Sequence, residues 1–359
     1  MDEATSARIA GSYARRDGGD YALFVRVAMY YGLGKIRLQA APDPVAGPGE
    51  IVIRMTACGI CGTDLMGWYQ DPRAPVVLGH EPVGVVHQVG EGAPFAIGER
   101  VFVHHHVPCF VCDRCRAGRH TLCERFRQTN IDPGGLAELI RVPAENVRAD
   151  VLRLPDGVSD WVATLVEPLA CVLRGLRQVE VGPGVRVAIV GAGGMGLLEA
   201  QAAVAFGAGR VVVIEPRADR RAVAQSLGFA VLSSSDPEAL KREMGGALAD
   251  VVIVCTHDHG AIAGALALAG HSARIQLFAP TEPGEFVALD LGSIFFREVS
   301  IGATYSAGPF DTREALDLLA AGQIDAGAIV SHRVPFDRVE HAFDLARDGT
   351  AIKVVVENP

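Results

Sequence analysis

The sequence predicts an α/β protein of two domains, a β-rich one followed by a doubly wound one. Short apolar runs separated by glycine and proline turns fill residues 23–103, and apolar runs alternate with helical patterns over residues 169–255. A chain of 359 residues is also longer than one hydrophobic core usually serves. We expect a flexible extension at 1–22, a β-rich domain at 23–176, an α/β domain at 177–309 and a segment at 310–359 that returns to the β-rich domain.

The composition indicates a globular protein and excludes several classes of function. Apolar residues make up 49% of the chain and charged residues 21%, with a net charge of -9. A phosphate backbone requires a basic face, so we expect no nucleic-acid partner. No stretch approaches the ~20 apolar residues of a membrane span, and the polar N-terminus does not resemble a signal peptide. We therefore expect a cytoplasmic protein whose eight cysteines are thiols or metal ligands.

The β-rich half is predicted from its turns. Residues 42–44 (PDP) and 47–49 (GPG) interrupt apolar runs between residues 23 and 55, and four glycines punctuate residues 83–103. Short strands between such turns are typical of a small barrel.

The second half is predicted from alternating periodicity. An apolar run of four or five residues followed by a helical pattern is typical of parallel strands covered by helices. Helices are expected at 169–179, 195–206, 217–227 and 312–321, and strands at 187–190, 210–214, 251–255 and 352–356.

Four cysteines in a polar loop form the first candidate metal site. They follow the pattern C-x2-C-x2-C-x7-C, and the two-residue gaps let neighbouring thiolates face one ion. Four sulfur ligands with no open position suit a structural Zn²⁺. An iron–sulfur cluster is the alternative for four thiolates, but the rest of the chain favours zinc. The ligands are Cys109, Cys112, Cys115 and Cys123.

A second set of possible ligands is scattered along the chain. A catalytic zinc takes about three protein ligands and leaves one position for water or substrate. Cys58 and His80 offer a thiolate and an imidazole, and either Glu81 or Glu167 can add a carboxylate. Each residue alone has an ordinary structural explanation, so the prediction depends on the group. The tract of three histidines at 104–106 is interpreted as structural, because neighbouring side chains in an extended segment point to opposite faces.

A glycine motif lies between the strand expected at 187–190 and the helix that follows it. In the G-x-G-x-x-G pattern of dinucleotide-binding turns, the glycines permit a tight turn, close approach to the pyrophosphate and close helix packing. Glu215 ends the next strand, about twenty residues on, where a carboxylate can bind the adenosine ribose and repel a 2′-phosphate. NAD is therefore favoured over NADP. The candidate cofactor residues are Gly191, Gly193, Gly194, Met195, Gly196 and Glu215.

The order of these motifs resembles the zinc-containing medium-chain dehydrogenase/reductase superfamily over residues 25–356. The resemblance rests on residues 58–64 (CGICGTD), 79–90 (GHEPVGVVHQVG), the four cysteines, 167–169 (EPL) and the glycine motif. It implies a GroES-like zinc-binding catalytic domain, a Rossmann dinucleotide-binding domain, and one catalytic and one structural zinc per chain. Glu167 stands where the alcohol dehydrogenases themselves place a cysteine, so the chain looks more like the polyol and threonine dehydrogenases.

The resemblance also implies roles for individual residues. Cys58, His80 and Glu81 would bind the catalytic zinc, with Glu167 binding directly or through water, and Thr63 would relay the substrate proton. The relatives commonly form dimers or tetramers, so a homodimer or homotetramer is expected.

The expected function is oxidation of a secondary alcohol, such as a polyol or cyclitol, by hydride transfer to NAD, or the reverse reaction. L-Threonine or a simple alcohol is the second candidate substrate. Two further functions fit the same fold, namely a zinc-independent quinone or enoyl reductase and a non-enzymatic binding protein.

Overall fold

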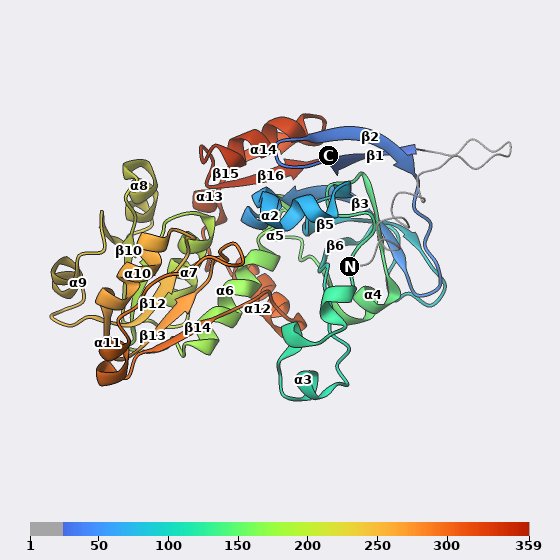
Figure 1. Ribbon diagram of the computed structural model, residues 1–359. Helices are drawn as coiled ribbons and strands as arrows, with labels where there is room; N and C mark the ends of the chain where they lie inside the picture. The colour runs from blue at the N-terminus through green and yellow to red at the C-terminus, as the bar shows by residue number, and fades with distance from the viewer. Residues whose placement is uncertain (1–23, 359) are drawn as a thin grey trace, which may run out of the picture. The chain divides into compact units, whose positions relative to one another are not determined.

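The computed structural model describes residues 24–358, which fold into two compact units (Figure 1). Unit 1 contains the described residues up to Val166 together with those from Ser331 onward, and unit 2 contains Glu167–Val330. The extension expected at 1–22 lies outside the described residues. The described residues after Val330 thus return to the first unit.

Unit 1 is built around two sheets. The larger has the strand order β15-β16-β3-β5-β6-β8, with β7 also paired to β3, and the smaller has the order β2-β1-β4. The apolar side chains of β1, β3 and β5 meet in one core with those of the returning segment. The strands are β1 (Phe24–Tyr30), β2 (Ile36–Pro42), β3 (Ile51–Gly59), β4 (Val76–Val77), β5 (Glu81–Val89), β6 (Arg100–Val103), β7 (Leu139–Val142), β8 (Val151–Arg153), β15 (Val330–Pro335) and β16 (Lys353–Glu357).

The helices of unit 1 are short except in the returning segment. Glycine and proline turns leave little room for helical runs between the strands. The helices are η1 (Gly62–Leu65), α2 (Gly67–Gln70), η2 (Asp71–Arg73), α3 (Asp113–Arg116), η3 (His120–Leu122), η4 (Phe126–Gln128), α4 (Ala144–Asp150), α5 (Asp160–Ala163), η5 (Phe336–Arg338) and α14 (Val339–Arg347).

Unit 2 is a six-stranded parallel sheet covered by helices. The strand order is β11-β10-β9-β12-β13-β14, so successive strands are added on one side from β9 to β11 and on the other side from β12 to β14. The point between β9 and β12 is the switch point of a Rossmann fold. Helix α7 (Gly194–Ala205) packs against β9 and β10, and α10 (His259–Leu268) packs against β12 and β13. The strands are β9 (Arg186–Val190), β10 (Arg210–Ile214), β11 (Ala230–Leu232), β12 (Ala249–Val254), β13 (Ala269–Leu277) and β14 (Ser300–Ala303).

The helices of unit 2 include two that the sequence analysis assigned to the β-rich domain. Helix α6 packs on the parallel sheet, where a side chain at Gly175 would meet Gln276 and Phe278 of the β13 region. Helix α12 is tied to α6 by an Arg177–Asp311 ion pair of 2.5 Å. The boundaries therefore fall at 166/167 and 330/331 instead of 176/177 and 309/310. The helices are α6 (Val166–Gln178), α7 (Gly194–Ala205), α8 (Ala218–Ser226), α9 (Pro237–Glu243), α10 (His259–Leu268), α11 (Leu291–Arg297), α12 (Pro309–Ala320) and α13 (Ala326–Ile329).

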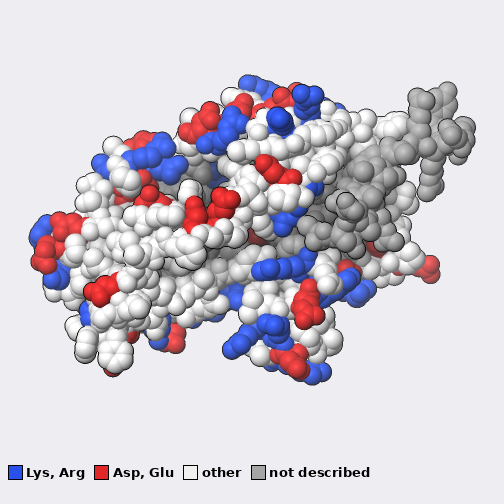
Figure 2. All heavy atoms as spheres, viewed as in Figure 1, with Lys and Arg blue, Asp and Glu red and all other residues white. Residues whose placement is uncertain are grey.

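Acidic and basic side chains are interspersed over the face shown in Figure 2. Within the described part of the chain, none of the helices has the length and apolar character needed to cross a membrane.

Candidate functional site

Three possible metal ligands of different chemistry meet in unit 1. One ligand atom each of Cys61, His80 and Glu81 lies within 4.8 Å of the other two. Cys61 follows strand β3, His80 directly precedes strand β5, and Glu81 is the first residue of β5. The antiparallel pairing of β3 and β5 places Gly59 opposite Glu81, so the end of one strand lies beside the start of the other. A thiolate, an imidazole and a carboxylate are thereby brought to one point.

Cys58 is not a member of this group, contrary to our expectation. It pairs with Pro82 in the β3–β5 ladder, one residue before the Gly59–Glu81 pair. Successive side chains of a strand point to opposite faces of the sheet, so Cys58 and Glu81 project from opposite faces. The Cys58 side chain belongs to the hydrophobic core. Burial raises the pKa of its thiol, and the nearby Glu81 and Asp64 carboxylates raise it further.

Asp64 holds two members of the group in place. Its Oδ2 atom accepts a hydrogen bond of 3.0 Å from the Cys61 main-chain N–H, and its Oδ1 atom lies 3.4 Å from His80 Nδ1. Burial alone would lower the pKa of His80, but the Asp64 carboxylate and the Cys61 sulfur raise it well above its ordinary value. Asp64 therefore accepts a hydrogen bond from the main chain and also faces the imidazole.

The carboxylate of Glu81 is held by a lysine from the last strand of the chain. Lys353 Nζ lies 2.6 Å from both Glu81 oxygens, and both side chains are buried, Glu81 completely. Glycine at position 59 makes room for the pair, because a Cβ atom there would collide with the Glu81 carboxylate and lie 3.1 Å from Lys353 Cε. Sequence reasoning missed Lys353, although a lysine within the apolar run 351–356 (AIKVVV) was a usable signal.

The two remaining candidates lie in different units. Thr63 is half-buried in η1, between Cys61 and Asp64 in sequence, and its carbonyl accepts a hydrogen bond of 3.1 Å from Gln70. Glu167 is buried in the first turn of α6, and the Cys171 thiol donates to it at 3.5 Å. Its role as a metal ligand stays a prediction.

The four cysteines of the loop form a second group in unit 1. Their four sulfur atoms all lie within 4.8 Å of one another. Main-chain N–H donors of Val111 and Cys112 lower the pKa of Cys109 to about 6, while burial raises the pKa of Cys115 to about 12. Phe126 packs against the buried cysteines of this group. The members are Cys109, Cys112, Cys115 and Cys123.

The glycine motif forms the turn between β9 and α7 of unit 2. Gly191 has a φ of 105°, which favours glycine, and its N–H donates to Ile214 O at 2.8 Å. A side chain at Gly196 would collide with the Gly191 carbonyl. Helix α7 begins at Gly194 after the cap residue Gly193, so free main-chain N–H groups lie at this turn.

Glu215 ends β10 and braces the same turn. One carboxylate oxygen accepts from Ala192 N–H at 2.8 Å and the other from Arg217 N–H at 2.9 Å. The Arg220 guanidinium approaches within 3.9 Å of where a side chain at Gly193 would begin. An acidic side chain, Glu215, and a basic one, Arg220, therefore both lie near the glycine turn.

Comparison with known proteins decides the family. Residues 47–156 match the alcohol dehydrogenase GroES-like domain, and residues 194–321 match the zinc-binding dehydrogenase domain. The sorbitol dehydrogenase of Arabidopsis thaliana is 30% identical over 354 residues, covering 91% of this chain and 94% of that protein. The chain belongs to the zinc-containing medium-chain dehydrogenase/reductase superfamily.

Other members of the superfamily agree with the branch that the sequence predicted. The L-threonine 3-dehydrogenase of Bacillus velezensis is 30% identical, covering 89% of this chain and 94% of its own length. A solved putative zinc-binding dehydrogenase of Sinorhizobium meliloti, bound to NADP, has a TM-score of 0.84 at 28% identity and covers 94% of this chain and 100% of that one. The chain is thus an oxidoreductase of the polyol and threonine dehydrogenase branch. The expected fold is confirmed, and so are zinc and a nicotinamide dinucleotide as the cofactors of the family.

Proposed function

We propose that this dehydrogenase oxidises a secondary alcohol, such as a polyol or cyclitol, to a ketone with NAD, or catalyses the reverse reduction. The observation that carries the proposal is the convergence of Cys61, His80 and Glu81 within 4.8 Å of one another. A thiolate, an imidazole and a carboxylate suit the three-ligand pattern of a catalytic zinc, which leaves one position for substrate. When bound, zinc lowers the pKa of a hydroxyl group and stabilises charge on its oxygen.

Two carboxylates, Glu81 and Glu167, are candidates for the third protein ligand. Glu81 lies in the group but is also paired with Lys353. We propose Glu81 as the ligand that this unit supplies, and Glu167 as a second carboxylate that acts directly or through water. The four-cysteine loop is proposed to hold the structural zinc, because four sulfurs leave no position open.

The residues around the metal set prepare it for the reaction. Asp64 faces His80 Nδ1 and leaves Nε2 for the metal, which is the usual carboxylate–histidine arrangement at metal sites. Thr63 is proposed to take the substrate proton through its hydroxyl group, because it lies in the short helix η1, two residues after the cap residue Cys61. This chain's side chains thus position the reacting hydroxyl and move its proton, and a bound nicotinamide would supply the hydride acceptor.

The glycine turn is proposed to bind the pyrophosphate of NAD at the N-terminus of α7. Glu215 supports NAD over NADP, because a buried carboxylate at the end of β10 disfavours a 2′-phosphate. Arg220 is the residue that could oppose this preference. Comparing kcat/KM for NAD and NADP with one substrate tests the choice, and a preference for NADP would overturn it.

Metal analysis and a substrate panel test the whole proposal. We expect two zinc ions per chain and NADH formation, read from its absorbance, with secondary polyols or cyclitols. Activity confined to primary alcohols would overturn the substrate class, and preference for L-threonine would favour the second candidate, which the threonine dehydrogenase relative supports. Activity that survives removal of the catalytic metal would favour a zinc-independent reductase. One zinc or none, with no NAD binding, would favour a non-enzymatic binding protein.

We further propose that the protein is a homodimer or homotetramer. Strand β14 is the last strand of the parallel sheet, and all four of its residues are exposed. Several large apolar side chains near it in sequence are also exposed, namely Phe286, Leu291, Phe295 and Phe296. A second copy pairing along this edge would cover them. The molar mass in solution of the protein and of an Ile301→Lys variant tests this, and an unchanged monomer would contradict it. The cytoplasmic location remains a prediction.

A further inference from the structure

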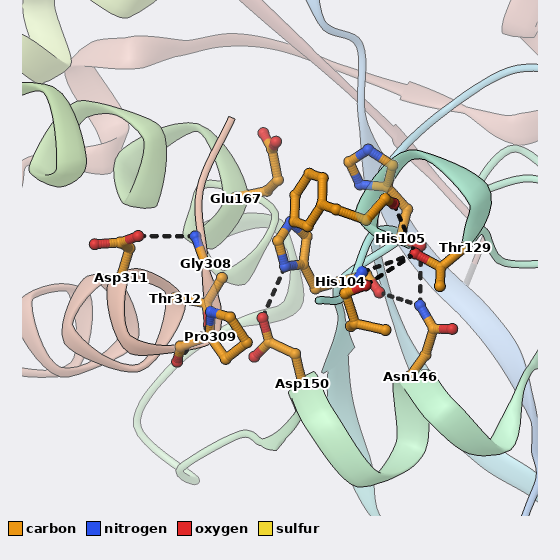
Figure 3. Close-up of polar contacts among 12 residues, drawn as sticks. His104, His105, Thr129, Asn146, Asp150, Glu167, Gly308, Pro309, Asp311 and Thr312 are labelled. Carbon is orange, nitrogen blue, oxygen red and sulfur yellow. Dashed lines mark hydrogen bonds and ion pairs between the residues drawn. The ribbon is translucent and has the colours of Figure 1, made fainter. Parts of the chain in front are cut away.

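A buried histidine–aspartate pair lies in unit 1 outside the proposed catalytic group. His104 follows strand β6, and its Nδ1 atom lies 2.7 Å from Oδ2 of Asp150, the last residue of α4 (Figure 3). The exposed fraction is 0% for His104 and 1% for Asp150. Since a carboxylate accepts hydrogen bonds, Nδ1 carries the proton and Nε2 presents its lone pair. Over residues 24–358, that buried Nε2 atom has no hydrogen-bond partner.

The next residue offers a second imidazole to the same place. The ring centroids of His104 and His105 are 5.3 Å apart, and one ring nitrogen of each lies within 4.8 Å of the other. His105 Nδ1 is likewise buried, and no described residue forms a hydrogen bond with it. The side chain of Asn146 fixes the main chain of both histidines, because its Nδ2 donates to their carbonyls at 3.0 and 2.9 Å (Figure 3).

This arrangement differs from the expectation that neighbouring histidines point to opposite faces. That expectation applies to a strand, but β6 ends at Val103 and the histidines lie in the irregular segment after it. The two rings can therefore approach each other. Leaving two buried ring nitrogens without partners costs free energy unless something binds them.

We propose that His104 and His105 form a second binding site for a divalent transition-metal ion such as Zn²⁺, with His104 ligating through Nε2. A carboxylate on the other ring nitrogen is the usual partner of a metal-binding histidine, because it fixes the ring and raises its basicity. One ring nitrogen of each histidine lies within 4.8 Å of the other, so rotation of the rings can bring both nitrogens onto one ion. With two histidine ligands and water, it binds more weakly than the two zinc sites already proposed.

The position of this site gives it a consequence for the enzyme. The ring centroid of His105 lies 5.0 Å from that of His80. A cation bound here would stand beside the proposed catalytic group and compete for the substrate oxygen, so excess zinc should inhibit turnover. This consequence rests on the proposed function, but the metal site itself does not.

Zinc binding to the loaded protein tests the site directly. The protein carrying its resident zinc is dialysed against buffered Zn²⁺, and bound zinc is counted by mass spectrometry. We expect one additional, weaker zinc per chain, absent from His104→Gln and weakened about 10- to 100-fold in Asp150→Asn. His106→Gln is the matched control and should keep the ion, because His106 Nδ1 is already bonded to Thr129 O at 2.5 Å.

No additional zinc in the wild-type protein would overturn the proposal, as would an additional zinc that His104→Gln retains, since it would sit on other histidines. If His104→Gln fails to fold by circular dichroism, Asp150→Asn decides, and unchanged zinc affinity in that variant overturns the proposal. Zinc binding that passes these tests in a protein without dehydrogenase activity would uphold the metal site and reject only the proposed function.

Discussion

Replacing Lys353 with methionine should destabilise unit 1 strongly, because it leaves Glu81 as a buried carboxylate without its cation. Glu81 is fully buried, and both of its oxygens lie 2.6 Å from Lys353 Nζ. Removing one partner of such a pair costs about 3–5 kcal/mol. The folding equilibrium should therefore fall by roughly a hundredfold to several thousandfold. Glu81→Gln should cost less, since Lys353 lies nearer the surface and keeps a polar neighbour.

The two tryptophans provide a local reading of this effect. Trp68 and Trp161 both belong to unit 1, so their fluorescence during urea unfolding reports on the unit that contains the pair. The variants Lys353→Met, Glu81→Gln and the double variant complete a cycle, measured with zinc present at constant concentration. The double variant should be more stable than the sum of the two single losses, because it removes both charges together.

Two results would refute the reasoning. A loss below about 1 kcal/mol in Lys353→Met would mean that another group, such as the zinc itself, compensates Glu81. Strict additivity in the double variant would mean that the two side chains do not interact, whatever their separation.

Three further predictions concern the metal, the fold and the cofactor. Cys61→Ser should lose one zinc per chain and all activity, whereas Cys58→Ser should keep its zinc content and its activity. If metal analysis showed the loss of zinc in Cys58→Ser and not in Cys61→Ser, Cys58 would be the ligand. Glu199 in α7 is fully buried, its carboxylate has no hydrogen-bond partner among the described residues, and burial raises its pKa well above the ordinary value. The folded state therefore holds this proton more tightly than the unfolded state, so wild-type stability should fall as pH rises above about 4.5. Glu199→Gln should remove that slope, so its stability relative to the wild type should rise with pH in urea unfolding followed by circular dichroism, and parallel pH profiles would contradict it. Gly196→Val should weaken NAD binding about tenfold or more at unchanged zinc content, because the new side chain meets the Gly191 carbonyl; unchanged NAD affinity in a fluorescence titration would contradict this.

The elements that sequence reasoning located are those whose pattern is local. Strands β9 and β12 are almost fully buried, and β10 is buried over its last three residues, so their residues form apolar runs. Strand β13 escaped notice because polar residues such as Ser272 and Arg274 break its run, and β14 because its residues are small and exposed. The sequence of one segment does not predict a strand that forms because of its packing against neighbouring strands.

The group of possible ligands that the structure brings together differs from the predicted set for the same reason. The motif at 58–64 contains two cysteines, and only the end of β3 at Gly59 shows which one leaves the sheet to meet His80. Lys353 could not be paired with Glu81 from sequence, because the two residues are 272 positions apart. Spacing rules describe ligands on one loop, such as the four cysteines, and fail for ligands gathered from separate strands.

The separation of Glu81 and Lys353 along the chain also determines when their ion pair can form during synthesis. Strand β3 and Glu81 leave the ribosome early, whereas β16, which pairs with β3 and carries Lys353, is made only after all of unit 2. Until then the carboxylate has no lysine partner and the sheet has an open edge at β3 on that side. Unit 2, which is continuous in sequence, has every strand it needs before unit 1 does. The nascent first unit therefore lacks its ionic pair until strand β16 has been made.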